Sequence, residues 1–202
     1  CRRIFLRTLV DRILFQKAFT KQYPDEQNDY TYSEAADQKK NGDIVGEGAN
    51  ALARFLYSHI PKIGDAINGK KIIAIFDNDK EGVDQYDKIA KDYEKTYERI
   101  KIENVEVLKH KKYSVYVTKL IPPDFRERWV NSKAKYCYLS VELLLHDADI
   151  PEVNRDYIPD TNPTKYTFKA GSKINFANNI SNDTDFSGFQ KTIDLIRKIK
   201  NL

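Results

Sequence analysis

The stretch Lys71-Ile72-Ile73-Ala74-Ile75-Phe76-Asp77-Asn78-Asp79 decides the fold of this chain. Its first six residues form a largely β-branched apolar run, which is typical of a central parallel strand covered on both faces. The segment from Gly82 to Ile100 is predicted to be one long helix, because apolar residues recur there every three or four positions. A strand that leads into a helix, with further strands on either side, indicates an α/β protein with an open, mainly parallel sheet flanked by helices.

The remaining elements follow from the same periodicities and from the positions of proline. Before the central strand we expect a strand at 3–6, a helix at 9–19 that ends by Pro24, a loop over 23–41, a weak strand at 43–45 and a helix at 50–60 that ends before Pro61. After it we expect strands at 105–108 and 113–120, a helix at 139–145, a loop-like stretch at 151–172 and a final amphipathic helix at 186–202. We expect a core domain at 1–121 and a smaller, helical C-terminal extension at 122–202 that packs on it.

The composition indicates a globular protein but does not indicate a function. The chain has 202 residues, of which 41% are hydrophobic and 32% charged, and these values fit a globular protein. No apolar run reaches the roughly 18 residues of a membrane span. The net charge of +4 decides little about a polyanionic partner. Cys1 and Cys137 lie far apart, which argues against a zinc site or a disulfide framework and favours a cytoplasmic location. The chain does not begin with Met, and we interpret it as part of a larger protein.

Asp77 and Asp79 are the clearest candidates for chemistry. They follow the best strand at its carboxyl end, where open α/β sheets place their ligands, and two such carboxylates can hold Mg²⁺. A surface turn is the plain structural alternative, because Asp favours turns. A calcium loop is excluded because Lys88 stands where the bidentate acid is required. An aspartyl-phosphate site remains a minor alternative.

Several segments resemble one known family. The stretch 72–82 looks like the Asp-x-Asp segment of a Toprim domain, particularly of the OLD (overcoming lysogenisation defect) nucleases. Gly46-Glu47-Gly48-Ala49-Asn50 resembles the family's glycine-rich turn, Leu139-Ser140-Val141-Glu142 its Ile-Glu segment, and Gly171-Ser172-Lys173-Ile174-Asn175-Phe176-Ala177 its Lys-x-x-Phe-Ala segment. The resemblance covers nearly the whole chain, and its Asp-x-Asp segment is the specific part.

The resemblance implies a Toprim-like fold and a DNA endonuclease that hydrolyses phosphodiesters with two divalent ions, Mg²⁺ or Mn²⁺. By resemblance the metal ligands would be Asp11, Asp77, Asp79 and Glu142, and Lys173 would neutralise charge on the scissile phosphate. Asp77, Asp79 and Lys173 would be the catalytic residues. In the family an ATPase domain precedes the Toprim domain, and the protein often serves in defence against phage; homo-oligomerisation is left open. Glu142 on an exposed helix face and Lys173 in an ordinary loop are the structural alternatives.

The chain departs from the family at its first acid. The family opens with a strand ending Val-Glu-Gly-x-x-Asp, and the aligned residues are Leu6-Arg7-Thr8-Leu9-Val10-Asp11, so that Arg7 replaces the glutamate. Glu47 is a poor substitute, because a Toprim core needs a helix, a strand and a second helix between its glutamate and its aspartates. An inactive Toprim-fold module for nucleic-acid binding or assembly is therefore the alternative to a nuclease. A primase-like or topoisomerase-like member of the fold is a weaker third alternative.

A basic segment with interleaved aromatic residues runs from Lys109 to Lys135. It carries eight Lys and Arg against two acids, and such a stretch can contact phosphates and stack on bases. An ordinary solvated basic face is the alternative. His59, His110 and His146 lack the spacing of metal ligands.

Overall fold

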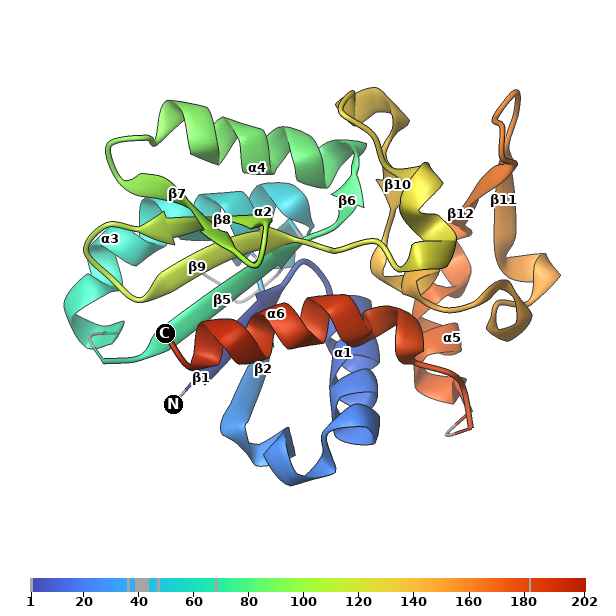
Figure 1. Cartoon of the computed structure of the whole chain (residues 1–202), viewed down its shortest axis with the longest axis horizontal. Coiled ribbons are helices and arrows are strands. Elements are labelled where there is room, and N and C mark those ends of the chain that lie inside the picture. The colour runs from blue at the N-terminus through green and yellow to red at the C-terminus, as the bar shows by residue number, and fades with distance from the viewer. Residues whose placement is uncertain (1, 36, 39–43, 47, 68, 182) are drawn as a thin grey trace.

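A computed structural model describes residues 2–35, 37–38, 44–46, 48–67, 69–181 and 183–202. Within these ranges the chain is an α/β protein built on a six-stranded sheet of order β2-β1-β5-β9-β8-β7 (Figure 1). The strands are β1 (Arg2–Leu6), β2 (Tyr30–Glu34), β5 (Lys71–Phe76), β7 (Tyr97–Ile102), β8 (Val105–His110) and β9 (Val115–Lys119). The pairs β1–β2, β1–β5 and β5–β9 are parallel, whereas β8 pairs antiparallel with both β7 and β9. The expected open sheet is confirmed as mixed and mostly parallel.

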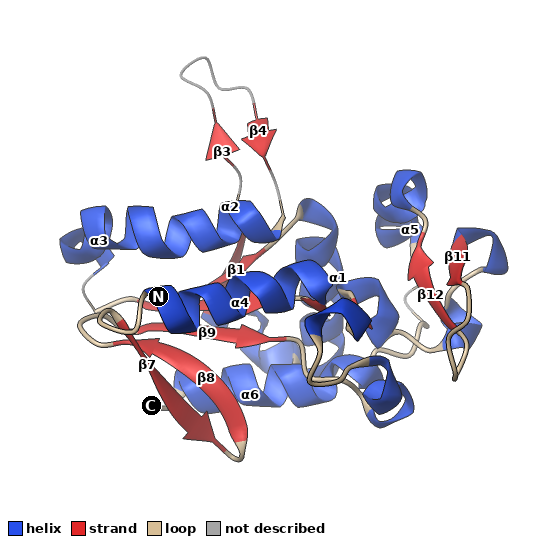
Figure 2. Cartoon of the chain, turned by 90° about the horizontal axis from the view of Figure 1, so that it is seen from above, coloured by secondary structure: helices blue, strands red, loops and turns tan. Residues whose placement is uncertain are grey.

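The prediction for 71–76 as a central, doubly covered strand is confirmed. Strand β5 lies between β1 and β9, and its residues alternate between two apolar clusters. Ile73 and Ile75 pack on the side of α1 (Leu9–Gln22) and α6 (Gln190–Lys200). Ile72, Ala74 and Phe76 pack on the side of α2 (Ala49–Arg54) and α4 (Lys80–Asp92). The sheet is thus the middle layer between two layers of helices, as Figures 1 and 2 show.

The second parallel strand lies elsewhere than expected. Residues 30–34 form β2 beside β1, inside a stretch that the composition predicted to be a loop. The weak strand expected at 43–45 corresponds to β4 (Ile44–Gly46), which pairs with β3 (Asp37–Gln38) in a separate hairpin seen in Figure 2; residue 43 lies outside the described residues. Tyr30 of β2 is buried, and its ring packs on Phe19 of α1 at a centroid distance of 4.7 Å. The order helix, strand, helix between β1 and β5 is therefore present.

Pro61 does not end the helix that precedes it. Helix α2 continues through a π-helical turn, Phe55–His59, into α3 (Ile60–Ile63). The π-turn places the Ile60 amide on the Phe55 carbonyl, five residues earlier, and a wider turn of this kind accommodates a proline that lacks an amide proton. The helix begins at Ala49, one residue before the expected start at 50, and Gly48 is its N-cap at a φ of 88° that favours glycine.

The predicted long helix at 82–100 is wrong after Asp92. Helix α4 ends at Asp92, and residues 97–102 instead form the edge strand β7, which pairs with β8. The connecting residues Glu103 and Asn104 both have positive φ, as tight hairpins require, although neither is glycine. The strands expected at 105–108 and 113–120 are confirmed as β8 and β9.

The C-terminal segment is less helical than expected. The predicted helix at 139–145 is a short strand, β10 (Tyr138–Leu139), followed by a 3-10 turn over Val141–Leu144. The predicted loop at 151–172 contains the hairpin β11 (Arg155–Ile158) and β12 (Lys165–Phe168), and α5 (Lys173–Asn179) follows it. Strand β10 pairs with β6 (Asn78–Asp79), which joins this segment to the end of β5.

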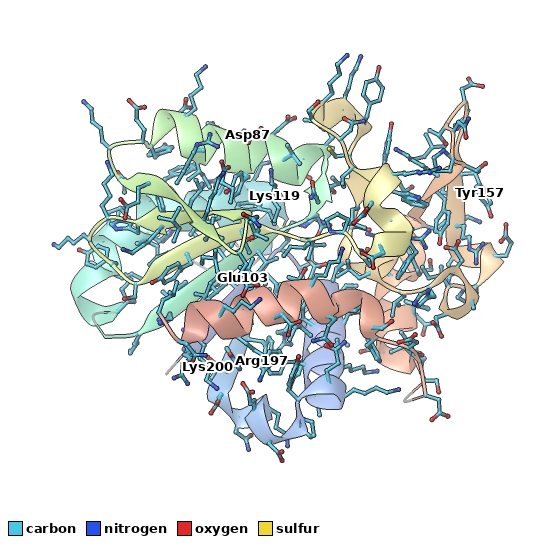
Figure 3. The ribbon with its side chains drawn as sticks, in the orientation of Figure 1. Asp87, Glu103, Lys119, Tyr157, Arg197 and Lys200 are labelled. Atoms are coloured by element: carbon cyan, nitrogen blue, oxygen red, sulfur yellow. The ribbon has the colours of Figure 1, made fainter. Side chains whose placement is uncertain are left out.

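The final helix is confirmed as α6 and covers the sheet. Its buried residues Ile193, Ile196 and Ile199 lie in the same cluster as Ile73 and Ile75. The Lys71 ammonium donates to the carbonyls of Ile199 and Lys200, which attaches the end of α6 to the start of β5. Figure 3 labels Arg197 and Lys200 on the side of α6 nearest the Pro24–Asp29 turn, where both bond to Glu26.

One core cluster therefore includes residues from both sides of the boundary expected at 121. The division into two domains remains a prediction. Among the described residues, no helix combines the length and the apolar character needed to cross a bilayer.

Candidate functional site: an arginine enclosed by carboxylates

Three acids and Arg7 meet at one edge of the sheet. Arg7 follows β1 and Asp77 follows β5, and because these strands are adjacent and parallel their carboxyl ends lie together. Asp79 caps α4, with its Oδ1 accepting the Gly82 amide at 2.7 Å. Asp11 lies in the first turn of α1, where its carboxylate accepts the Thr8 amide in a capping box. The sheet and the two helix starts thus fix all four side chains.

The Arg7 guanidinium lies among these carboxylates. Its Nη2 is 2.5 Å from Asp77 Oδ2, its Nη1 donates to Asp79 Oδ2 at 3.2 Å, and its Nε lies 3.7 Å from Asp11 Oδ2. Arg7 is 8% exposed, and Asp11 and Asp77 are each 3% exposed. The Arg7 carbonyl also accepts the Gly48 amide at 3.1 Å, so the glycine turn holds this residue in place.

Glu142 and Lys173 complete the cluster from the C-terminal segment. Glu142 is 1% exposed in the 3-10 turn after β10, and Lys173 is the first residue of α5. The Lys173 ammonium lies 2.8 Å from Glu142 Oε1. The pairing of β10 with β6 brings Glu142 to the site, because it sets Tyr138 opposite Asp79. The structural alternatives of an exposed Glu142 and a loop Lys173 are wrong.

Burial and charge act in opposite directions on the pKa values of the cluster. Burial raises the pKa of Asp77 well above its usual value and that of Asp11 to about 6, and Arg7 opposes both changes. Burial lowers the pKa of Arg7, but the surrounding carboxylates, Asp77 first, outweigh burial and raise it overall. Burial raises the pKa of Glu142 and lowers that of Lys173. The ion pair between them outweighs burial, so the Glu142 pKa is low and the Lys173 pKa is high.

The site contains four carboxylates and two cations, and its polar atoms are not all satisfied. Arg7 Nε and Glu142 Oε2 are buried without a hydrogen-bond partner, and Asp77 Oδ2 meets Arg7 as an ion pair without the angle of a hydrogen bond. One guanidinium is shared by three acids. Burial outweighs this shared cation, so the pKa values of Asp11 and Asp77 rise although Arg7 lies beside them.

The two divalent ions that the resemblance implies do not fit this arrangement. The space between Asp11, Asp77 and Asp79 holds a guanidinium, whose charge would repel a cation. Among the described residues, no three His, Cys, Asp or Glu side chains are placed to hold a metal ion. The predicted ligands therefore do come together, but around Arg7.

A cleft of about 450 Å³ opens beside the cluster. Arg7, Asp79 and Lys173 reach it from the site, and Lys80, Lys135, Cys137, Tyr138 and Phe168 are among its other lining residues. Cys137 is a buried free thiol. Tyr138 and Phe168 come from β10 and β12, and no pattern in the sequence pointed to them, because both strands lie in stretches expected to be helical or irregular.

The basic segment from Lys109 to Lys135 does not form one surface. Tyr116 and Trp129 are core residues, and Arg126 is 3% exposed, stacked over the Trp129 ring and paired with Asp147. Lys119, which Figure 3 labels beneath α4, lies over the Tyr86 ring. Lys135 alone of the eight basic residues lines the cleft beside Arg7.

The other candidate residues add nothing to the site. Glu47 lies outside the described residues. His110 is buried against Tyr97 and Tyr113, and His146 stacks on Phe125. Comparison of the chain with models of protein families, with curated proteins and with solved structures finds no match in any of the three.

Proposed function

We propose that this chain is a Toprim-like domain that binds nucleic acid in the cleft beside Arg7 without cleaving it. The observation that carries the proposal is the Arg7 guanidinium, which lies between Asp77 and Asp79 where the resembled nucleases would hold metal. The order of elements between Arg7 and Asp77, a helix, a parallel strand and a second helix, supports the Toprim assignment.

Of the residues described, those that line the cleft offer one unpaired cation and one accessible ring to an anionic ligand. Lys135 can meet a backbone phosphate, and the half-buried Tyr138 offers a ring on which a base can stack. Lys80 and Lys173 also line the cleft but pair with Asp84 and Glu142. Lys135 is exposed and has no acidic partner in the part of the chain described, so its charge is available to a ligand.

The proposal is tested by binding and cleavage assays on the same samples. Fluorescence anisotropy with labelled single- and double-stranded DNA should show binding in EDTA that weakens as salt rises. Lys135→Glu should weaken binding about tenfold or more, because reversing one charge removes one phosphate contact and adds a repulsion. Lys111→Glu is the matched control, since Lys111 is exposed in the turn between β8 and β9, at the opposite end of the sheet. Equal binding by the two variants would exclude the cleft.

A metal-dependent DNA endonuclease is the second candidate function. The convergence of Asp11, Asp77, Glu142 and Lys173 favours it, because these are the groups that the resemblance assigns to such a site. Incubation of supercoiled DNA with Mg²⁺ or Mn²⁺ separates the candidates. Cleavage that disappears in Asp77→Ala would establish the nuclease, whereas binding without cleavage, with cleavage gained in Arg7→Glu, would support the inactive domain.

A further inference from the structure

Three carboxylates from three separate elements share one internal cation. Asp11 belongs to α1, Asp77 to the end of β5 and Asp79 to the start of α4, and Arg7 reaches all three from the end of β1. Two of the aspartates divide their contacts: Asp79 gives Oδ1 to the Gly82 amide and Oδ2 to Arg7, and Asp11 also caps its own helix. The guanidinium is thus the common partner that joins four chain segments.

Acids buried together need either protons or a cation to offset their repulsion. Asp11 and Asp77 are almost completely buried, and like charges that approach one another in a medium of low dielectric repel strongly. Two kinds of cation can hold three such carboxylates together: a hard divalent ion with oxygen ligands, or an arginine, which is always protonated and carries five donors in a planar fork. This chain uses the arginine.

We infer that Arg7 is a covalently attached substitute for a divalent ion. Asp11, Asp77 and Asp79 are not placed to hold a metal ion while Arg7 lies between them, and removal of the Arg7 side chain lets these three acids close on a divalent cation. The intact protein then needs no metal to hold β1, β5, α1 and α4 together, and it gains nothing from one. This inference rests on the ion pairs of the site and is independent of whether the cleft binds DNA.

Thermal unfolding of Arg7→Gln tests the inference. Glutamine removes the charge while keeping much of the length, so the variant should melt below the wild type in EDTA. Mn²⁺, Mg²⁺ or Ca²⁺ should then raise its Tm by about 5–10 °C at one hundred times the dissociation constant of the ion. NaCl of equal ionic strength should not do so, and the Tm of the wild type should not respond to any of the three ions.

Three further variants identify the source of the response. Arg12→Gln is the matched control, because Arg12 is a half-buried arginine that pairs with Glu34 and not with the three aspartates, and it should melt close to the wild type. Arg7→Gln combined with Asp77→Asn should lose the rescue by cations. Arg7→Lys keeps a charge at the site and should show no rescue. A response in this lysine variant equal to that of Arg7→Gln would overturn the inference, since the missing charge would not be its cause.

Other results would also contradict it. Stabilisation of the wild type by Mn²⁺ beyond the effect of salt would show that Arg7 does not exclude the ion. An Arg7→Gln protein rescued by low pH but not by any divalent ion would show that the acids take up protons and form no cation site. If Arg7→Gln does not fold in EDTA, refolding on addition of Mn²⁺ is the expected result, and failure to refold in both Mn²⁺ and Mg²⁺ would overturn the inference.

Discussion

Arg7 shows how one residue sets the character of a site. A glutamate at this position would add a fifth acid to the four already present. Arginine instead reduces the excess of negative charge and pairs with three of the acids. Removing one partner from a buried ion pair typically costs about 3–5 kcal/mol, because the other charge is left uncompensated. The surrounding acids therefore depend on Arg7 as much as Arg7 depends on them.

The raised pKa of Asp11 predicts how stability changes with pH. Burial raises this pKa to about 6, against about 3.9 in an unfolded chain. Between about pH 4 and pH 6 the folded protein holds a proton that the unfolded chain has lost, so the free energy of unfolding should fall as pH rises, by up to about 3 kcal/mol. Urea unfolding at four pH values from 4 to 7 measures this slope.

Asp11→Asn should flatten that slope, and its amide oxygen can still accept the Thr8 amide. Asp92→Asn, at an exposed position at the end of α4, is the control and should keep it. An unchanged slope in Asp11→Asn would mean that Asp11 is ionised throughout the range. Asp77, whose pKa is raised by the same burial, would supply the slope that remains.

The membership of the site was predictable, but its geometry was not. The resemblance named Asp11, Asp77, Asp79, Glu142 and Lys173, and all five come together. The sequence also marked Arg7 as a departure. That Arg7 would turn inward and bind the acids, in place of pointing to solvent, depends on the pairing of β1 with β5, whose two strands are separated by more than 60 residues of chain.

At the scale of elements, the junction between β5 and α4 positions the site. The chain turns sharply after Phe76, and Gly82 in the first turn of α4 lies against the Asp77 backbone. A Cβ added at Gly82 would lie 2.2 Å from the Asp77 carbonyl oxygen. Only glycine allows the helix to begin this close to the strand end.

Gly82→Ala should therefore destabilise the protein by about 1–3 kcal/mol, although alanine is the better helix former at most positions. Gly171→Ala is the control, because a Cβ there meets nothing within 4 Å, and it should change stability little. Chemical denaturation of the two variants gives the comparison. A Gly82→Ala protein as stable as Gly171→Ala would show that the junction can relax.

Elements with one dominant pattern were predicted well, and those with two competing patterns were not. The apolar run at 71–76 permits only a buried strand. Tyr93, Tyr97 and Ile100 fit a helical period. The run Arg99-Ile100-Lys101-Ile102, however, alternates polar and apolar residues as in a strand, and pairing with β8 decides between the two patterns. Strand β2 could not be predicted from the sequence, because several of its residues face solvent and it contains too few apolar residues to show a strand pattern.

At the scale of the whole molecule, the C-terminal segment completes both the core and the site. Residues 1–121 alone would lack α6, whose Ile193, Ile196 and Ile199 cover the sheet, and would lack Glu142 and Lys173. We expect this fragment to show no cooperative thermal transition and to bind a hydrophobic dye.

The separate segment 122–202 should restore a cooperative transition when it is refolded with the fragment, and the intact chain is the reference. A cooperative transition of 1–121 alone would show instead that the sheet is stable without its last helix and would support the expected domain boundary.

The strand order has a consequence for the kinetics of folding. Strand β1 pairs with β5, and this places Arg2 opposite Lys71, which comes 69 residues later in the chain. The end of α6 attaches to the same Lys71. Such pairings give the fold a high contact order. Folding is then slow, because the entropy of closing long loops is lost before the contacts that offset this loss can form. On a ribosome, the part of the sheet face that α6 covers stays exposed until the final turn of α6 has emerged. A chaperone that shields apolar surface would therefore act on this protein until α6 has been synthesised.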